Sequence, residues 1–125
     1  MSNAPSQTGQ AAEQAACTYL ESQGLNLLEK NYRCCLGEID LIMTDISTLV
    51  FVEVRYRRQL SYGSGAESVT YGKQQKIIKT AQHFLASHQS HTDKACRFDV
   101  ISVTHTPRNY AFNWIKDAFQ LNHGY

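Results

Sequence analysis

The sequence lacks the features that mark membrane and secreted proteins. No stretch approaches the ~18 consecutive apolar residues that a membrane-spanning helix needs. The N-terminus is rich in Ser, Gln and Ala and has no basic segment followed by an apolar one, so a secretory signal peptide is not indicated. We therefore expect a cytoplasmic protein with no membrane partner.

Patterns that hold zinc or build a nucleophilic triad are also missing. The four cysteines show no C-x-x-C spacing, and the neighbours Cys34 and Cys35 are poorly placed to bridge, because that disulfide is strained. We expect free thiols. No zinc spacing occurs among the five histidines, which are His83, His88, His91, His105 and His123. Neither a Ser–His–Asp arrangement nor a glycine-rich phosphate loop can be argued.

The sequence also lacks an excess of charge of either sign. Twelve basic and eleven acidic residues give a formal net charge of +1, so contacts with phosphate groups must come from local clusters. In contrast, 42% of the 125 residues are hydrophobic, which is enough for the core of one compact domain. We expect a flexible tail over residues 1–7 and a single domain over residues 8–125.

Hydrophobic periodicity predicts the elements of this domain. Helices are predicted over residues 8–24 and 70–88, with Gly24 ending the first. Strands are predicted over residues 27–32, 38–43, 49–56 and 97–104, with a loop over residues 59–68. The segment 110–119 is predicted to be a strand followed by a short helical turn. This order predicts an α/β sandwich with a mixed sheet.

The strands on either side of residues 45–48 form a hairpin whose register can be derived. If the turn is centred between Ile46 and Ser47, one face carries the apolar pairs Met43 with Val50, Leu41 with Val52, and Ile39 with Val54. The other face then pairs Asp40 with Glu53, Glu38 with Arg55, and Ile42 with Phe51. A slip by one residue would place acidic side chains on the core face, so the register is well specified.

In this register two carboxylates stand opposite each other. The Cβ atoms of Asp40 and Glu53 are expected ~5 Å apart, and like charges so placed destabilise a sheet. Mg²⁺ or Mn²⁺ would compensate, because hard cations prefer carboxylate oxygens. Arg55 points to the same face as Glu53 and can hold a phosphate or orient a water. The alternative is a surface hairpin whose charges form ordinary salt bridges.

At these residues the sequence resembles the bacterial YraN-like family, which is similar to Holliday-junction resolvases and to the PD-(D/E)xK nuclease superfamily. The resemblance rests on residues 37–42 (GEIDLI), 51–57 (FVEVRYR), Lys73 and 97–101 (RFDVI). It implies a restriction-endonuclease-like fold with an αβββαβ core. It also implies a Mg²⁺- or Mn²⁺-dependent endonuclease that hydrolyses phosphodiester bonds in DNA, branched DNA included, and acts as a homodimer.

The resemblance further implies roles for single residues. The positions that match metal ligands are Glu13, Asp40, Glu53 and, through its backbone carbonyl, Val54. Arg55 stands where the superfamily has its catalytic Lys. Arg is planar and permanently charged, so it can bind a phosphate but is not equivalent to Lys. Lys73 is a candidate to supply the missing amine from the second helix.

Several of these residues also have a plainer interpretation. Glu13 lies among alanines and can be a solvated carboxylate on a helix face. Asp99 can be the structural partner of a basic residue rather than a metal ligand. The residues that would rim a groove for a phosphate backbone are Arg55, Arg57, Arg58, Lys73 and Lys76. The lysines among them can equally form a solvated helix face.

Three functions stay open at this level. The first is a metal-dependent endonuclease-like protein that acts on nucleic acid, with DNA as the expected partner. The second is a non-catalytic nucleic-acid-binding module on the same fold, favoured by Arg55 and the near-neutral charge. The third is a scaffold with no nucleic-acid partner. For a homodimer, the candidate interface is the apolar C-terminal set Trp114, Ile115 and Phe119.

Overall fold

The computed structural model describes residues 7–57, 69–91 and 93–120. Its elements are α1 (Gln7–Ser22), β1 (Asn26–Cys34), β2 (Gly37–Asp45), β3 (Thr48–Arg57), α2 (Tyr71–Ser87), the 3-10 turn η2 (Gln89–His91), β4 (Cys96–His105) and β5 (Tyr110–Phe119). The predicted order of helix, three strands, helix and strand is confirmed. The predicted loop over residues 59–68 and Arg58 lie outside the described residues.

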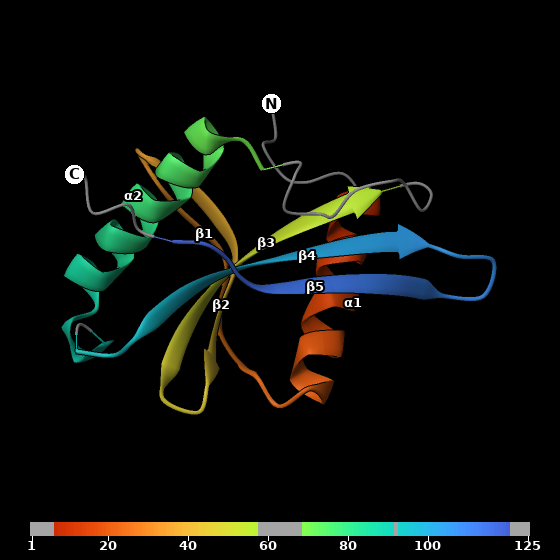
Figure 1. Cartoon of the computed structure of the whole chain (residues 1–125), viewed down its shortest axis with the longest axis horizontal. Coiled ribbons are helices and arrows are strands. Elements are labelled where there is room, and N and C mark those ends of the chain that lie inside the picture. The colour runs from red at the N-terminus through yellow and green to blue at the C-terminus, as the bar shows by residue number, and fades with distance from the viewer. Residues whose placement is uncertain (1–6, 58–68, 92, 121–125) are drawn as a thin grey trace.

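The five strands form one sheet in the order β1-β2-β3-β4-β5. β3 and β4 run parallel, whereas the other neighbouring strands are antiparallel. A parallel pair needs a long connection, and α2 lies within it. Figure 1 shows α1 and α2 on either side of the strongly twisted strands. The predicted α/β fold with a mixed sheet is confirmed.

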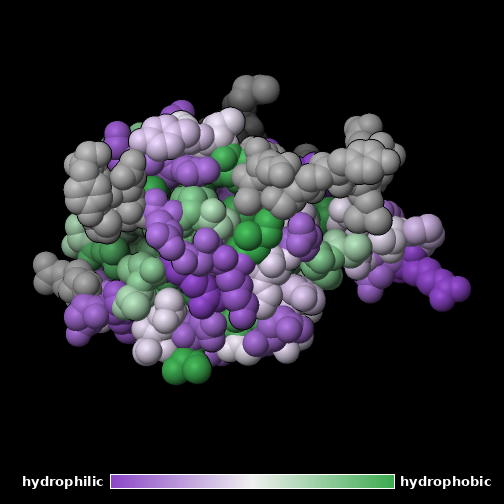
Figure 2. Space-filling view, in the orientation of Figure 1, coloured by the Kyte–Doolittle hydropathy of each residue, from purple (hydrophilic) through white to green (hydrophobic). Residues whose placement is uncertain are grey.

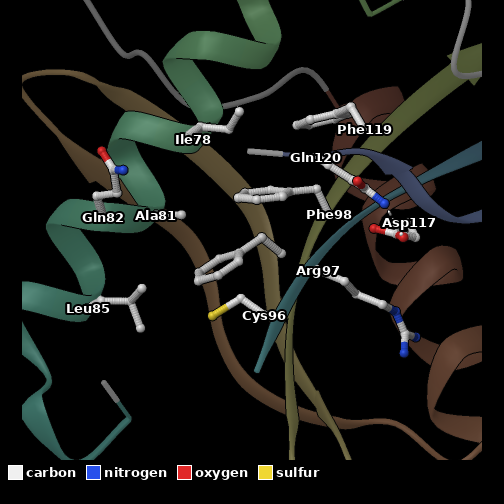
Figure 3. Close-up of a pocket in the computed structure, with 11 residues that line it drawn as sticks. Ile78, Ala81, Gln82, Leu85, Cys96, Arg97, Phe98, Asp117, Phe119 and Gln120 are labelled. Atoms are coloured by element: carbon white, nitrogen blue, oxygen red, sulfur yellow. Dashed lines mark hydrogen bonds between the residues drawn. The ribbon is translucent and has the colours of Figure 1, made fainter. Parts of the chain in front are cut away.

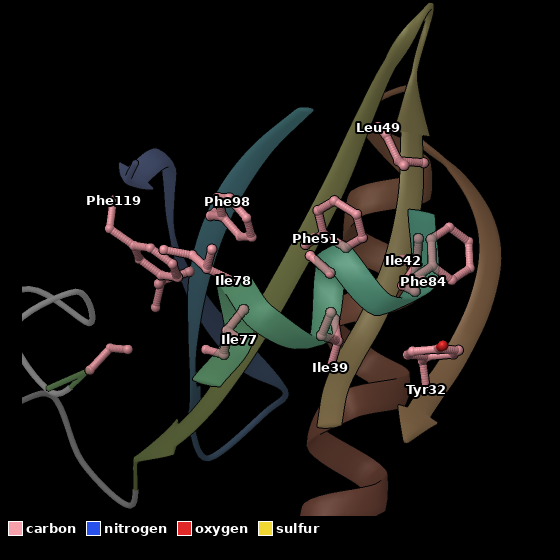
Figure 4. Packing of buried hydrophobic residues seen from close by; sticks show 13 residues of the cluster. Tyr32, Ile39, Ile42, Leu49, Phe51, Ile77, Ile78, Phe84, Phe98 and Phe119 are labelled. Carbon is pink, nitrogen blue, oxygen red and sulfur yellow. The ribbon is translucent and has the colours of Figure 1, made fainter. Parts of the chain in front are cut away.

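Each face of the sheet has its own hydrophobic cluster. On one face α1 contributes Ala12, Ala16, Cys17 and Leu20. On the other face α2 contributes Ile77, Ile78, Ala81 and Phe84, which pack against strand residues such as Phe51 and Phe98 (Figure 4). These helix residues recur at helical spacing, so each helix buries one stripe. A large side chain buried in this way contributes roughly 1.5–3 kcal/mol.

The start of α2 is fixed by a side-chain cap. The hydroxyl of Thr70 accepts a hydrogen bond from the backbone N–H of Lys73 at 3.2 Å, which satisfies one of the free donors at the helix start. At the other end the backbone N–H of His88 donates to Leu85. The predicted helix over residues 70–88 is therefore right to within its two cap residues. The cap also fixes the first turn, which carries Lys73.

The hairpin between β2 and β3 has the predicted register. Its ladder runs from Leu41 opposite Val52 to Asp45 opposite Thr48, and Ile46 and Ser47 form the turn. Along these two fully described strands the ladder ends at Leu41 and Val52. The predicted pairs Asp40 with Glu53, Ile39 with Val54 and Glu38 with Arg55 are therefore not ladder pairs. The two strands part just where the acidic residues begin.

One predicted face is wrong at Ile39. Ile39 packs in the cluster on the α2 side, whereas Leu41 packs on the α1 side. The neighbouring strand explains this change. Pairing with β1 passes from Lys30 opposite Leu41 to Tyr32 opposite Ile39, and Asn31 between them has a φ of +52°. A left-handed residue interrupts the alternation of a strand, so the next pair faces the other way.

The C-terminal segment is strand throughout. β5 continues to Phe119, so the helical turn predicted within residues 110–119 is wrong. Phe119 stacks on Phe98 with ring centroids 5.1 Å apart and belongs to the core, which keeps the segment on the sheet. Trp114 packs edge-on against Tyr19. Two of the three residues proposed for a dimer interface therefore make contacts within the chain.

The structure bears on two features of the sequence, its cysteines and its lack of long apolar runs. All four cysteines are free, as predicted. No helix in the described ranges is long and apolar enough to cross a membrane. Figure 2 shows hydrophilic residues interspersed with hydrophobic areas on the visible face.

Candidate metal centre

The end of the β2–β3 ladder holds a pair of carboxyl groups. Asp40 is the first residue of β2 beyond the ladder, and its Oδ2 accepts a hydrogen bond of 2.8 Å from the backbone N–H of Val54. A side chain thus satisfies a β3 donor that lies beyond the last ladder pair. The charge of the nearby Glu53 carboxyl raises the pKa of Asp40. The two carboxyl groups therefore lie near each other without forming a ladder pair.

Glu53 is buried among cations. Its side chain is only 6% exposed, and a buried carboxylate needs partners. Oε2 of Glu53 lies 2.9 Å from Nζ of Lys73 and 3.5 Å from Nη1 of Arg55. Lys73 comes from the capped first turn of α2, and Arg55 from the same face of β3. Lys73, the residue predicted to supply an amine from the second helix, thus lies beside Glu53.

Two acids near the end of the ladder have raised pKa values. Burial, and then the charge of Glu53, raise the pKa of Asp40 well above its ordinary value, and the N–H of Val54 only partly opposes them. In α1, burial raises the pKa of Glu13, an effect that a hydrogen bond from Asn31 reduces and the charges of Glu38 and Glu53 increase. Carboxylates so placed repel one another when all are ionised.

A divalent cation fits this donor set. Its charge would remove the repulsion that raises the pKa of Asp40, and carboxylate oxygens suit Mg²⁺ or Mn²⁺. In the described parts of the chain no group of three or more His, Cys, Asp or Glu side chains is drawn together closely enough to hold a metal ion. The direct protein ligands would thus be Asp40 and Glu53. Mg²⁺ commonly uses one or two carboxylates and keeps several waters.

Glu38 does not join this pair in the predicted way. It forms an exposed ion pair with Arg33 of β1 at 2.9 Å, whereas Arg55 lies beside Glu53. Glu38 and Arg55 are not a ladder pair, because the β2–β3 ladder ends before these residues come opposite each other.

Asp99 has a structural set of contacts. It is fully buried and accepts hydrogen bonds from Nε of Arg97 at 3.0 Å, Nε1 of Trp114 at 2.9 Å and the backbone N–H of Asp117 at 2.9 Å. The same Arg97 reaches Asp45 at the end of β2 at 3.0 Å. These contacts favour the interpretation of Asp99 as the partner of a basic residue over that of a metal ligand.

Two of the other predicted cations lie on the same helix or strand as Lys73 and Arg55. Lys76 is exposed one turn after Lys73 on α2, and Arg57 follows Arg55 at the same strand spacing on β3. Tyr71, at the start of α2, is an exposed aromatic residue near them in the chain. Arg58 cannot be placed, since it lies outside the described residues.

A cavity of about 460 Å³ lies between α2 and the β4–β5 strands. Phe51, Phe98 and Phe119 line it, together with Ile78 of α2 (Figure 3). In Figure 3 the guanidinium of Arg97 points away from these rings. None of the acids of the candidate metal centre lines the cavity, so the two features are separate.

Asn31 is the site residue that sequence reasoning missed. It falls between the pairs that Lys30 and Tyr32 make across β1 and β2, its φ is +52°, and its side chain lowers the pKa of Glu13. The available signal was an Asn inside a strand pattern, since Asn is enriched in the left-handed region.

Comparison with known proteins gives the family. A model of the uncharacterised protein family UPF0102 matches residues 12–103, a segment that contains Glu13, Asp40, Glu53 and Val54. The chain is similar to a UPF0102 protein of Nitrosococcus oceani, with 47% identity over 113 residues that cover 90% of this chain and 91% of the relative. This match bears out the resemblance to the YraN-like family.

Two further bacterial relatives match to the same extent. A UPF0102 protein of Stutzerimonas stutzeri is 48% identical over 113 residues, which cover 90% of this chain and 94% of the relative. The UPF0102 protein NE0719 of Nitrosomonas europaea is 49% identical over 111 residues, which cover 89% and 92%. Identity extends along nearly the whole length of each protein, so the chain belongs to the uncharacterised protein family UPF0102.

Proposed function

We propose that this protein is a Mg²⁺- or Mn²⁺-dependent endonuclease-like phosphodiester hydrolase that acts on DNA, branched DNA included. The observation that carries the proposal is the buried carboxyl of Glu53 at the end of the ladder, with Nζ of Lys73 2.9 Å from it and the carboxyl of Asp40 held nearby by the N–H of Val54. Acids that suit a cation thus lie beside an amine that suits a phosphate. The element order supports a restriction-endonuclease-like fold as part of the same proposal.

The residues divide the chemistry among them. A cation held by Asp40 and Glu53, with the carbonyl of Val54 as a further ligand, would polarise the scissile phosphate and activate water. Glu13 would stand outside the direct ligands, because no three acids of the described residues come close enough together to hold one ion. Lys73 and Arg55 neutralise negative charge that develops on the phosphate oxygens. The guanidinium of Arg55 offers paired donors to one phosphate, whereas Lys73 acts as a point charge on a flexible stem.

Binding of the rest of the nucleic acid falls to the surrounding cations. Lys76, Arg57 and Arg58 extend the basic set beyond the cleavage site. Each phosphate neutralised by such a residue makes affinity fall with added salt. The near-neutral net charge of +1 therefore predicts a local footprint of a few phosphates rather than a long basic track.

The second candidate is a non-catalytic nucleic-acid-binding module on the same fold. The observation in its favour is Arg55, because a guanidinium keeps its proton and cannot take over every role of a lysine amine. In this case Arg55 and Lys73 bind phosphate and the acids set the local charge.

A cleavage assay separates these functions. Purified protein is incubated with radiolabelled four-way junction, flap and linear DNA, in Mg²⁺, in Mn²⁺ or with chelator. We expect cutting that needs the metal and stops with chelator. Binding without cutting would favour the binding module, and neither binding nor cutting at low salt would leave only a scaffold.

Lys73→Ala is expected to slow cleavage by about 10- to 100-fold, as is usual when a partner of a metal ligand is removed. Lys73 is half-exposed, so its loss should leave the fold intact. The matched control is Lys79→Ala, an exposed lysine of the same helix almost two turns further on. Single-turnover rates measure both. If Lys73→Ala cleaves like the wild type, Lys73 has no part in the reaction.

A further inference from the structure

The helix α2 approaches the start of β2 very closely at Gly37. A Cβ atom placed on Gly37 would lie 3.0 Å from Oγ1 of Thr80 and 3.8 Å from both Cβ and the carbonyl oxygen of Lys76. Non-bonded heavy atoms pack best at ~3.5–4.0 Å, so this space admits no side chain. Gly37 also has a φ of +153°, which residues with a side chain disfavour. Both features require glycine at this position.

The hydroxyl group of Thr80 is fixed in its place. Thr80 is fully buried, and its Oγ1 donates a hydrogen bond of 2.8 Å to the carbonyl oxygen of Lys76, one turn earlier on α2. Rotation of this side chain would break that bond within a close-packed interior, where a lost hydrogen bond is costly. A side chain at Gly37 would therefore displace the helix rather than the hydroxyl group.

The same part of α2 carries Lys73 to the candidate metal centre. Lys73 and Thr80 are seven residues apart, so their side chains lie on one side of the helix about 10 Å apart along its axis. Thr80 lies against Gly37, whereas Nζ of Lys73 lies 2.9 Å from Oε2 of Glu53. The distance between α2 and β2 at Gly37 therefore determines whether Lys73 reaches Glu53.

We propose that Gly37 is a positioning residue: because it has no side chain, α2 approaches β2 closely enough for Lys73 to pair with Glu53. The use of this ion pair in cleavage rests on the proposed function, whereas the close approach of the helix does not. Gly37 itself touches neither metal nor substrate in this scheme.

The informative variant is Gly37→Ala, which adds only the Cβ atom. The matched control is Gly24→Ala. Gly24 also has a positive φ, of +102°, but no heavy atom of the described residues beyond its chain neighbours lies within 4 Å of a Cβ placed there. Gly24→Ala therefore reproduces the backbone strain without the contact. Thr80→Ala removes Oγ1 and is combined with Gly37→Ala to restore the space.

The first arm of the test uses protein with chelator and no metal. It measures by mass spectrometry how fast an amine-specific acylating reagent modifies Lys73, with the exposed Lys79 as the internal reference. Lys73 of Gly37→Ala is expected to react about three- to tenfold faster than that of the wild type, the range of one hydrogen bond, because an ammonium paired with Glu53 is shielded from the reagent. Gly24→Ala is expected to match the wild type, and the double variant to match Thr80→Ala.

Two results of this arm would overturn the proposal. One is an unchanged reactivity of Lys73 in folded Gly37→Ala, and the other is an equal increase in Gly24→Ala. If Gly37→Ala does not fold, the double variant decides. Folding restored by Thr80→Ala, with slow modification of Lys73, supports the proposal, and failure of the double variant to fold overturns it.

The second arm measures single-turnover cleavage in Mn²⁺. Gly37→Ala is expected to slow cleavage about tenfold, with no further loss when Lys73→Ala is already present, whereas Gly24→Ala is expected to cleave like the wild type. Additive losses would overturn the proposal. If the wild type does not cleave, the proposed function fails, and the metal-free arm alone decides the role of Gly37.

Discussion

Glu53→Ala is expected to lower the rate of metal-dependent cleavage by more than about 100-fold. Even the mutation of a residue that only supports a metal ligand typically lowers metal affinity or activity by 10- to 100-fold. Glu53 lies near Asp40 and contacts Lys73 and Arg55, so its removal takes away a proposed ligand and the anchor of both cations. Single-turnover cleavage in Mn²⁺ and Mn²⁺ titration calorimetry measure the two losses.

The fold should survive this change. Lys73 and Arg55 are 46% and 31% exposed, so both can turn to water when Glu53 is absent. Glu53→Gln keeps the volume and serves as a second variant, and Glu21→Ala removes an exposed carboxylate of α1 as the control. A folded Glu53→Ala protein that still binds Mn²⁺ and cleaves like the wild type would contradict the proposed centre.

Asp40→Asn is expected to stabilise the metal-free protein at pH 7 while it removes metal binding. Burial and neighbouring carboxylates raise the pKa of Asp40 in the folded state, so folding favours the protonated form. That contribution is fully present below the unfolded pKa of about 3.9 and is lost as the pH rises through the raised folded value. Asn is neutral throughout, and its side-chain oxygen can still accept from Val54.

The stabilisation by Asp40→Asn should depend on pH. With chelator, the melting temperature of Asp40→Asn should exceed that of the wild type at pH 7, by roughly 4 °C for each kcal/mol relieved, and the gap should close toward pH 4. Added Mn²⁺ should raise the wild-type value only. Asp93→Asn, an exposed carboxylate before β4, is the control. A lower melting temperature for Asp40→Asn at pH 7 would contradict the prediction.

Much of the fold could be predicted because its signals are local. The β2–β3 register follows from alternation and a two-residue turn, and the structure reproduces it from Leu41 to Asp45. The end of the ladder could not be predicted in this way. Ile39 changes face next to the left-handed Asn31 of β1, and alternation within a single strand carries no information about a neighbouring strand.

The sequence predicted which residues lie near the candidate centre better than it predicted which side chains contact each other. Asp40 and Glu53 do lie near each other, and Lys73 does reach Glu53. The ladder pair of Glu38 with Arg55 does not form, since pairing by register assumes that the ladder continues. The contacts of Asp99 with Trp114 and Asp117 join residues 15 and 18 positions apart through β5, which no short-range pattern reveals.

The ladder between β2 and β3 ends at Leu41 and Val52, while each strand stays paired with its outer neighbour, β1 or β4, beyond that point. Near the turn of this hairpin, Arg97 ties Asp45 to Asp99, whereas at the far end the first connection beyond the ladder is the single bond from Val54 to Asp40. A small change of twist there alters the spacing of Asp40 and Glu53 without breaking a ladder bond. Under the proposed function, we therefore expect the Asp40–Glu53 pair to accommodate the larger Mn²⁺ as readily as Mg²⁺.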